Sequence, residues 1–116
     1  MSYAQRQTVA VTTAADGSAT AYSSVVTGKL SQIHYVKTDF DDGVDFTITA
    51  EATGETLWAE PNVNDSTVRA PRHSTHASDG SVTPAMDKIA LAGDRVQIVI
   101  AAGGDSKTGT FILVFE

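Results

Sequence analysis

The stretch Val44-Asp45-Phe46-Thr47-Ile48-Thr49-Ala50-Glu51-Ala52 decides the fold class, because apolar and polar residues alternate along it. Successive side chains of a strand point to opposite faces, so Val44, Phe46 and Ile48 are predicted to enter a core. The same alternation recurs over residues 96–100 and, more briefly, over residues 8–12. β-Branched residues dominate all three segments, as is typical of strands.

Asp-Gly pairs separate the predicted strands at residues 16–17, 42–43 and 79–80. Both residue types tolerate the positive φ that tight hairpin turns require, so each pair predicts a hairpin. Strands are predicted near residues 6–13, 18–27, 29–37, 44–52, 55–59, 66–70, 81–84, 87–92, 95–102 and 109–116. Without a helical stretch of ten residues, this pattern predicts an all-β fold, an antiparallel β-sandwich or jelly-roll-like domain. The domain is expected to span residues 1–116, with residues 1–7 as a candidate extended N-terminal arm.

Two segments depart from simple alternation. Residues 111–115 (Phe-Ile-Leu-Val-Phe) are apolar on both faces, which suits a central strand covered on both sides or a strand whose outer face meets another chain. Residues 60–84 hold all three prolines. Because proline is excluded from central strands, this segment is predicted to be a long excursion or a set of short edge strands.

The composition narrows the function. The chain has 116 residues, a net charge of −6 and only eight scattered basic residues, which argues against nucleic acid and anionic membranes as partners. The absence of cysteine excludes disulfides and thiolate chemistry. No apolar run approaches the length of a membrane helix.

The segment around His73 and His76 is the strongest candidate for chemistry. On a helix, His73, His76 and Asp79 would share a face and could bind zinc, whereas on a strand an offset of three places them on opposite faces. The nearby prolines and the Asp-Gly pair argue against a helix. Ser74 lacks the Gly-x-Ser-x-Gly context of a nucleophile, so a small metal-dependent hydrolase is the least favoured alternative.

Three other segments suggest chemistry but fit simpler explanations better. The carboxylates within residues 39–45 could hold calcium, but they lack the EF-hand order, and a solvated acidic turn fits better. Residues 103–109 lack the phosphate-loop order, so a hairpin loop is predicted. Trp58 could stack on a sugar or anchor a protein, although a lone tryptophan is more often part of a core. No metal, catalytic residue or cofactor is predicted.

Several segments resemble small virion proteins encoded among the head genes of tailed bacteriophages. They are residues 28–33 (Gly-Lys-Leu-Ser-Gln-Ile), 45–49, 53–57, 70–73 leading to 79–80, 89–96 and 107–111. Together they extend over about three-quarters of the chain and leave the first strands outside. The resemblance implies a capsid cement or decoration protein, a β-sandwich that binds the outside of an assembled head, often as a trimer.

The resulting expectation is a non-enzymatic virion structural protein, made in the host cytoplasm and located on the capsid surface. Its partners would be the major capsid protein and further copies of itself, with a homotrimer favoured. A tail or neck component, or a host-surface carbohydrate-binding module, is the alternative. The candidate contact residues are Trp58, Arg69, Arg72, His73, His76, Ile112 and Val114.

Overall fold

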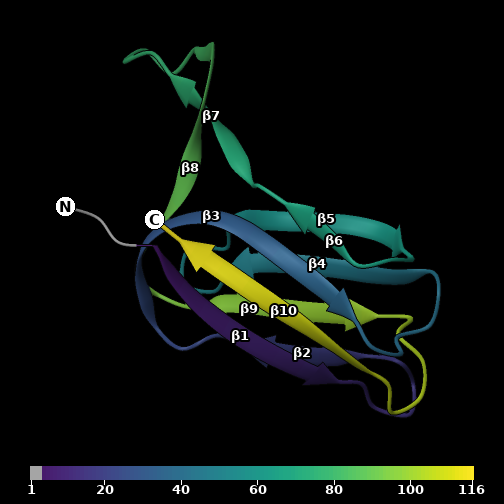
Figure 1. Cartoon of the computed structure of the whole chain (residues 1–116). Coiled ribbons are helices and arrows are strands. Elements are labelled where there is room, and N and C mark those ends of the chain that lie inside the picture. The colour runs from purple at the N-terminus through teal and green to yellow at the C-terminus, as the bar shows by residue number, and fades with distance from the viewer. Residues whose placement is uncertain (1–3) are drawn as a thin grey trace.

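The computed structural model describes residues 4–116 and contains two antiparallel sheets (Figure 1). Buried side chains alternate with more exposed ones along their central strands. The first sheet has the order β1 (Gln5–Thr12), β10 (Thr108–Phe115), β3 (Val26–Lys37), β8 (Val82–Asp94) and β7 (Arg72–His76), and β6 (Thr67–Arg69) also pairs with β3. The second sheet has the order β2 (Ala19–Tyr22), β9 (Val96–Ala101), β4 (Val44–Ala50) and β5 (Thr56–Val63). The prediction of an antiparallel all-β sandwich is confirmed. None of the described residues forms a helix long and apolar enough to cross a membrane.

Aromatic side chains from both sheets fill the centre of the sandwich. Phe46 of β4 lies edge to face against Tyr35 of β3, Phe111 of β10 and Trp58 of β5, with ring centroids 4.8, 5.0 and 5.2 Å apart. The alternation predicted around Phe46 is therefore confirmed, because this side chain lies where the two inner faces meet. Such aromatic pairs contribute about 1 kcal/mol each beyond the area they bury.

Most of the turns predicted as hairpins instead connect the two sheets. The Asp-Gly pair at residues 16–17 joins β1 to β2, and the pair at 42–43 joins β3 to β4; in both cases the two strands belong to different sheets. Residues 103–109 likewise cross from β9 to β10. The hairpin predictions are wrong at these three places and right at 79–80, between β7 and β8. A turn residue permits a reversal of direction, but it does not determine which strand becomes the partner.

The inter-sheet loops are hydrogen-bonded to one another at one end of the sandwich. The Thr13 amide donates to the carbonyl of Lys107 at 2.8 Å, and the Lys107 amide donates to Thr13 Oγ1 at 2.9 Å. The Gly103 amide donates to the carbonyl of Gly17 at 2.9 Å, and the Asp41 amide donates to the carbonyl of Gly103 at 3.0 Å. These bonds pair polar backbone groups where the strands end, and so close this end of the core.

Some predicted boundaries are corrected by the structure. Residues 5–7 belong to β1 rather than to an extended arm, Ala4 precedes that strand, and residues 1–3 of the proposed arm lie outside the described residues. Pro61 lies within β5, an edge strand of its sheet, and Pro84 lies within β8. Pro84 falls in an irregular stretch between the paired residues Val82 and Met86, where no ladder bond needs its missing N–H.

The Tyr35 hydroxyl is the one buried side-chain polar atom without a hydrogen-bond partner among the described residues. The residue is 1% exposed, and burial raises the pKa of its hydroxyl to about 12. An unpaired buried hydroxyl destabilises a core, since it has lost its bonds to water without replacing them.

Replacing Tyr35 with phenylalanine is therefore expected to raise the free energy of unfolding by about 1 kcal/mol at neutral pH. The pH dependence should change as well. The unfolded hydroxyl ionises near pH 10, whereas the folded one stays neutral up to about 12, so the wild type should lose stability across this interval. Urea denaturation at pH 8 and at pH 11.5 measures both effects. Equal losses in wild type and Tyr35→Phe would show that another group sets the alkaline limit.

Candidate partner-binding surface

Trp58 and Arg69 lie together, and both side chains bind Glu60 of the same domain. The Trp58 side chain is 6% exposed, and its indole Nε1 donates to Glu60 Oε1 at 3.0 Å. Arg69 binds the same carboxylate with two hydrogen bonds of 2.8 and 3.0 Å, and its guanidinium lies 5.6 Å from the centroid of the indole ring. Hydrogen bonds from Arg69 and Trp58 lower the pKa of Glu60. Trp58 thus offers almost no surface to a partner.

Arg72, His73 and His76 lie instead on a two-stranded ribbon that projects from the sandwich (Figure 1). We call residues 72–88 the β7–β8 arm. It consists of β7 and the first half of β8, whose second half continues into the first sheet beside β3. Among the described residues, β7 has no strand on its other side. Of the two alternatives predicted for residues 60–84, the set of short edge strands is the one that the structure matches, since β6 and β7 are short and β7 ends its sheet.

Two side-chain contacts hold the base of the arm against the sandwich. His73 Nδ1 lies 2.7 Å from Glu55 Oε2, a residue next to the turn between β4 and β5. Arg72 Nη1 donates to the carbonyl of Ser31 in β3 at 3.1 Å. His76 lies nearer the tip, opposite Val82. His73 also pairs across the ribbon, with Asp87, and its side chain contacts Glu55, whereas within residues 4–116 no hydrogen bond of the His76 side chain with His73 or Asp79 is found.

The tip of the arm uses a turn that also occurs at the opposite end of the molecule. In Asp79-Gly80-Ser81, the Ser81 amide and hydroxyl both donate to Asp79 Oδ1, at 3.0 and 2.6 Å. Asp16-Gly17-Ser18 makes the same two contacts at 3.0 and 2.7 Å. These serine hydrogen bonds lower the pKa of both aspartates. The tip is thus a hydrogen-bonded turn.

Apolar side chains are exposed on the arm at Val82 and Met86, with exposed fractions of 69% and 58%. Both lie on β8, in the half of that strand that pairs with β7. The sequence offered no direct sign of this exposure, since a valine and a methionine next to a strand are usually buried.

The other two candidate contact residues, Ile112 and Val114, lie on the outer face of β10. Their neighbours Phe111, Leu113 and Phe115 are buried in the core, whereas Ile112 and Val114 are half-buried. β10 lies between β1 and β3, so the outer side chains of both neighbours partly cover it. The prediction of a central strand with an apolar outer face matches this arrangement.

The carboxylates of residues 39–45 are dispersed among separate partners. Asp39 accepts hydrogen bonds from the Thr108 amide, which lowers its pKa, and Asp42 pairs with Lys37 at 2.6 Å. Asp45 accepts from the Asn62 amide at 3.0 Å. Within residues 4–116, no group of three or more acidic or histidine side chains is placed to hold a metal ion.

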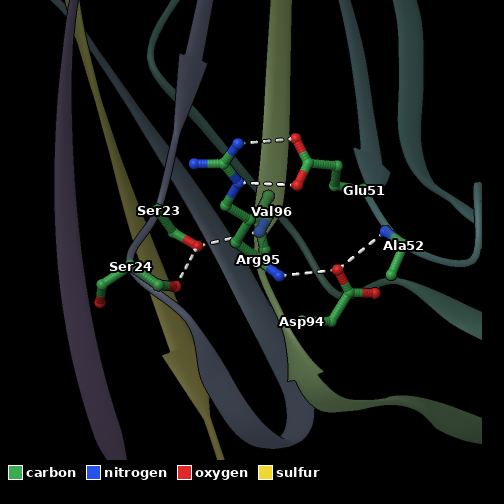
Figure 2. A network of polar contacts seen from close by, with 7 residues as sticks. All are labelled: Ser23, Ser24, Glu51, Ala52, Asp94, Arg95 and Val96. Carbon is green, nitrogen blue, oxygen red and sulfur yellow. Dashed lines mark hydrogen bonds and ion pairs between the residues drawn. The ribbon is translucent and has the colours of Figure 1, made fainter.

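A polar network that the sequence did not suggest lies where the chain passes from the first sheet to the second (Figure 2). Asp94 ends β8, and its Oδ1 accepts the amides of Ala52 and Arg95 at 2.9 and 2.7 Å. Arg95 in turn donates two hydrogen bonds to Glu51, at 2.8 and 2.9 Å. The Val96 amide donates to Ser23 Oγ at 2.9 Å. These hydrogen bonds connect β8, β9 and the turn after β4 at the corner where the chain changes sheets.

Two features of the described surface expose apolar side chains: the β7–β8 arm, at Val82 and Met86, and the outer face of the first sheet, at Val36 and Val68. The pocket at the base of the arm is lined by Gly28, Lys29, Asp87, Lys88 and Glu116. No family model matches the chain, and no curated protein matches it in sequence.

Proposed function

We propose that this chain is a non-enzymatic structural protein of a phage virion that binds the outside of an assembled capsid. The observation that carries the proposal is the β7–β8 arm, an ordered ribbon that presents apolar side chains to solvent. The resemblance of the sequence to phage head proteins supplies the partner, the major capsid protein. The chain would be made in the host cytoplasm and would act on the virion surface.

The arm suits such a role for a physical reason. An isolated two-stranded ribbon is marginally stable in water and gains stability when another element covers it. The side of β7 away from β8 can accept a further strand, and Val82 and Met86 can bury apolar area against a partner. A protein bound in this way stabilises the assembled form to which it binds, because binding lowers the free energy of that state alone.

Replacing Val82 and Met86 with aspartate is expected to weaken capsid binding at least tenfold, since two charges would be buried at the contact. Co-sedimentation of the purified chain with emptied heads of the phage whose genome encodes it measures this. Val25→Asp is the control for a single charge added to an exposed valine, because Val25 is 67% and Val82 69% exposed but Val25 lies between β2 and β3 rather than on the arm. The single variant Val82→Asp is compared with it. Circular dichroism confirms that each variant folds.

Two results would overturn the proposal in different ways. If the wild-type chain does not sediment with the heads, or sediments only with tails, it is not a capsid-binding protein. If the wild type binds and the arm variant binds equally well, the arm is not the contact.

A further inference from the structure

The outer face of the first sheet carries an unusual set of side chains for so acidic a protein. Register and alternation place the outward residues of four strands in three cross-strand rows. The rows are Ala10–Thr110–Val36, Thr8–Ile112–His34–Val68 and Arg6–Val114–Gln32. We call these ten residues the outer apolar face. Five of the ten are apolar, Ala10, Val36, Val68, Ile112 and Val114, and Ile112 lies in the middle row. Val36 and Val68 are among the most exposed large apolar residues of the described chain.

The outer apolar face contains no aspartate or glutamate, although the chain has fourteen acidic residues and a net charge of −6. Its one permanently charged side chain is Arg6, at the end of a row on the edge strand β1. The outer face of the second sheet is different: threonines and Gln97 dominate it, and Asp45 lies on it. The absence of acidic residues from one of the two faces therefore distinguishes that face from the rest of the acidic surface.

This charge pattern indicates which kind of partner the outer apolar face binds. A strongly acidic or basic partner would be matched by a face of opposite charge, and a single arginine does not provide one. A second copy of the chain needs a face that complements itself, which requires near-neutral charge and apolar side chains that can pack against their own kind. Contact between two copies through most other surfaces would bring carboxylates together, whereas contact here brings together none.

We infer that the outer apolar face binds a second copy of this chain in a two-fold symmetric dimer, with two sheets packed face to face. Sheets pack about 10 Å apart in this way, through interdigitating side chains. The two-fold axis lies in the plane between the two sheets and crosses the centre of the face near Ile112. An axis direction that does not run through the corner of the face that Arg6 occupies keeps the two Arg6 side chains apart. The β7–β8 arm stays available for another partner.

The dimer differs from the trimer that the family resemblance implies. A closed ring of three requires two different patches that complement each other, whereas the outer apolar face complements itself. A contact four strands wide is small by the standard of stable complexes, so the dissociation constant is expected in the micromolar range. The inference stands without the capsid proposal, because it concerns the purified chain alone.

Sedimentation velocity of the purified chain from about 5 to about 200 µM tests it across that affinity range. The wild type is expected to reach twice the 12.2 kDa mass of one chain at the upper end. Ile112→Glu should remain monomeric throughout, since it would bury two carboxylates beside the axis. Val99→Glu is the matched control: Val99 is also half-buried on the outer face of a central strand, β9, but in the second sheet. It should dimerise as the wild type does.

A monomeric wild type, or a mass of three chains, would overturn the inference. So would an Ile112→Glu variant that still dimerises, or a Val99→Glu variant that does not. Circular dichroism and the urea midpoint identify any variant that fails to fold. If Ile112→Glu is unfolded, Val68→Glu on the short strand β6 replaces it, with the same expected loss of dimer.

Discussion

Replacing Gly109 with alanine is expected to lower the free energy of unfolding by about 2 kcal/mol, in the range of overpacked cores. A Cβ atom at this position would lie 2.5 Å from Phe40 Cε2 and 2.8 Å from Phe40 Cδ2. The Phe40 ring cannot easily move away, because it is buried and stacks on Tyr35 with centroids 6.1 Å apart. Urea denaturation at neutral pH measures the loss.

A double-mutant cycle separates this steric effect from a general loss of backbone freedom at the glycine. Phe40→Leu shortens the side chain that would meet the new methyl group, so Gly109→Ala should be at least about 1 kcal/mol less destabilising in that background. The same loss in both backgrounds would show that the contact with Phe40 does not cause it.

Replacing Asp94 with alanine is expected to destabilise the fold by about 3 kcal/mol. The carboxylate is buried, and its Oδ1 accepts both the Ala52 and the Arg95 amides; hydrogen bonds to charged groups contribute about 1.5–3 kcal/mol each. Removing the acceptor leaves two backbone donors unpaired at the corner between the sheets. Thermal and urea denaturation both report the loss.

Asparagine provides the matched comparison at position 94, because its single carbonyl oxygen can accept the same two amides. Asp94→Asn should therefore lower the free energy of unfolding by less than half as much as Asp94→Ala does. Glu51→Gln removes only the exposed pairing with Arg95 and should change stability little. If Asp94→Asn and Asp94→Ala lower the free energy of unfolding equally, the negative charge of Asp94 stabilises the corner more than its acceptor geometry does.

The strands themselves could be predicted from the sequence because their burial is local information. Phe46 and its neighbours alternate in sequence and therefore alternate in space, whichever strand lies beside them. The doubly apolar segment 111–115 likewise identified a central strand, since both of its faces are at least partly covered.

The strand pairing could not be predicted in the same way. Asp-Gly turns appear alike whether the chain returns to the same sheet or crosses to the other one. The turns at Gly17 and Gly80 are nearly identical in hydrogen bonding, yet one links two sheets and the other closes a hairpin. Which of these occurs depends on long-range packing, and no residue near the turn encodes that packing.

Only part of the candidate surface could be predicted from the sequence, for a related reason. Trp58 and Arg69 were reasonable contact residues by type, but Glu60 engages both of them within the domain. The strands of the arm could not be predicted as one ribbon, because its prolines suggest irregular structure. Pro84 is compatible with a long strand because it falls where β7 and β8 are not paired in register. That irregularity is visible only once the partner strand is known.

The pairing of β1 with β10 has a mechanical consequence. Gln5 lies opposite Phe115, so a force applied through Ala4 and Glu116 would peel the two strands apart one ladder bond at a time. A force on the β7–β8 arm would act along β8, because this strand continues from the arm into the first sheet. It would stretch several hydrogen bonds between β8 and β3 at the same time. The molecule should therefore withstand more tension through its arm than through its chain ends.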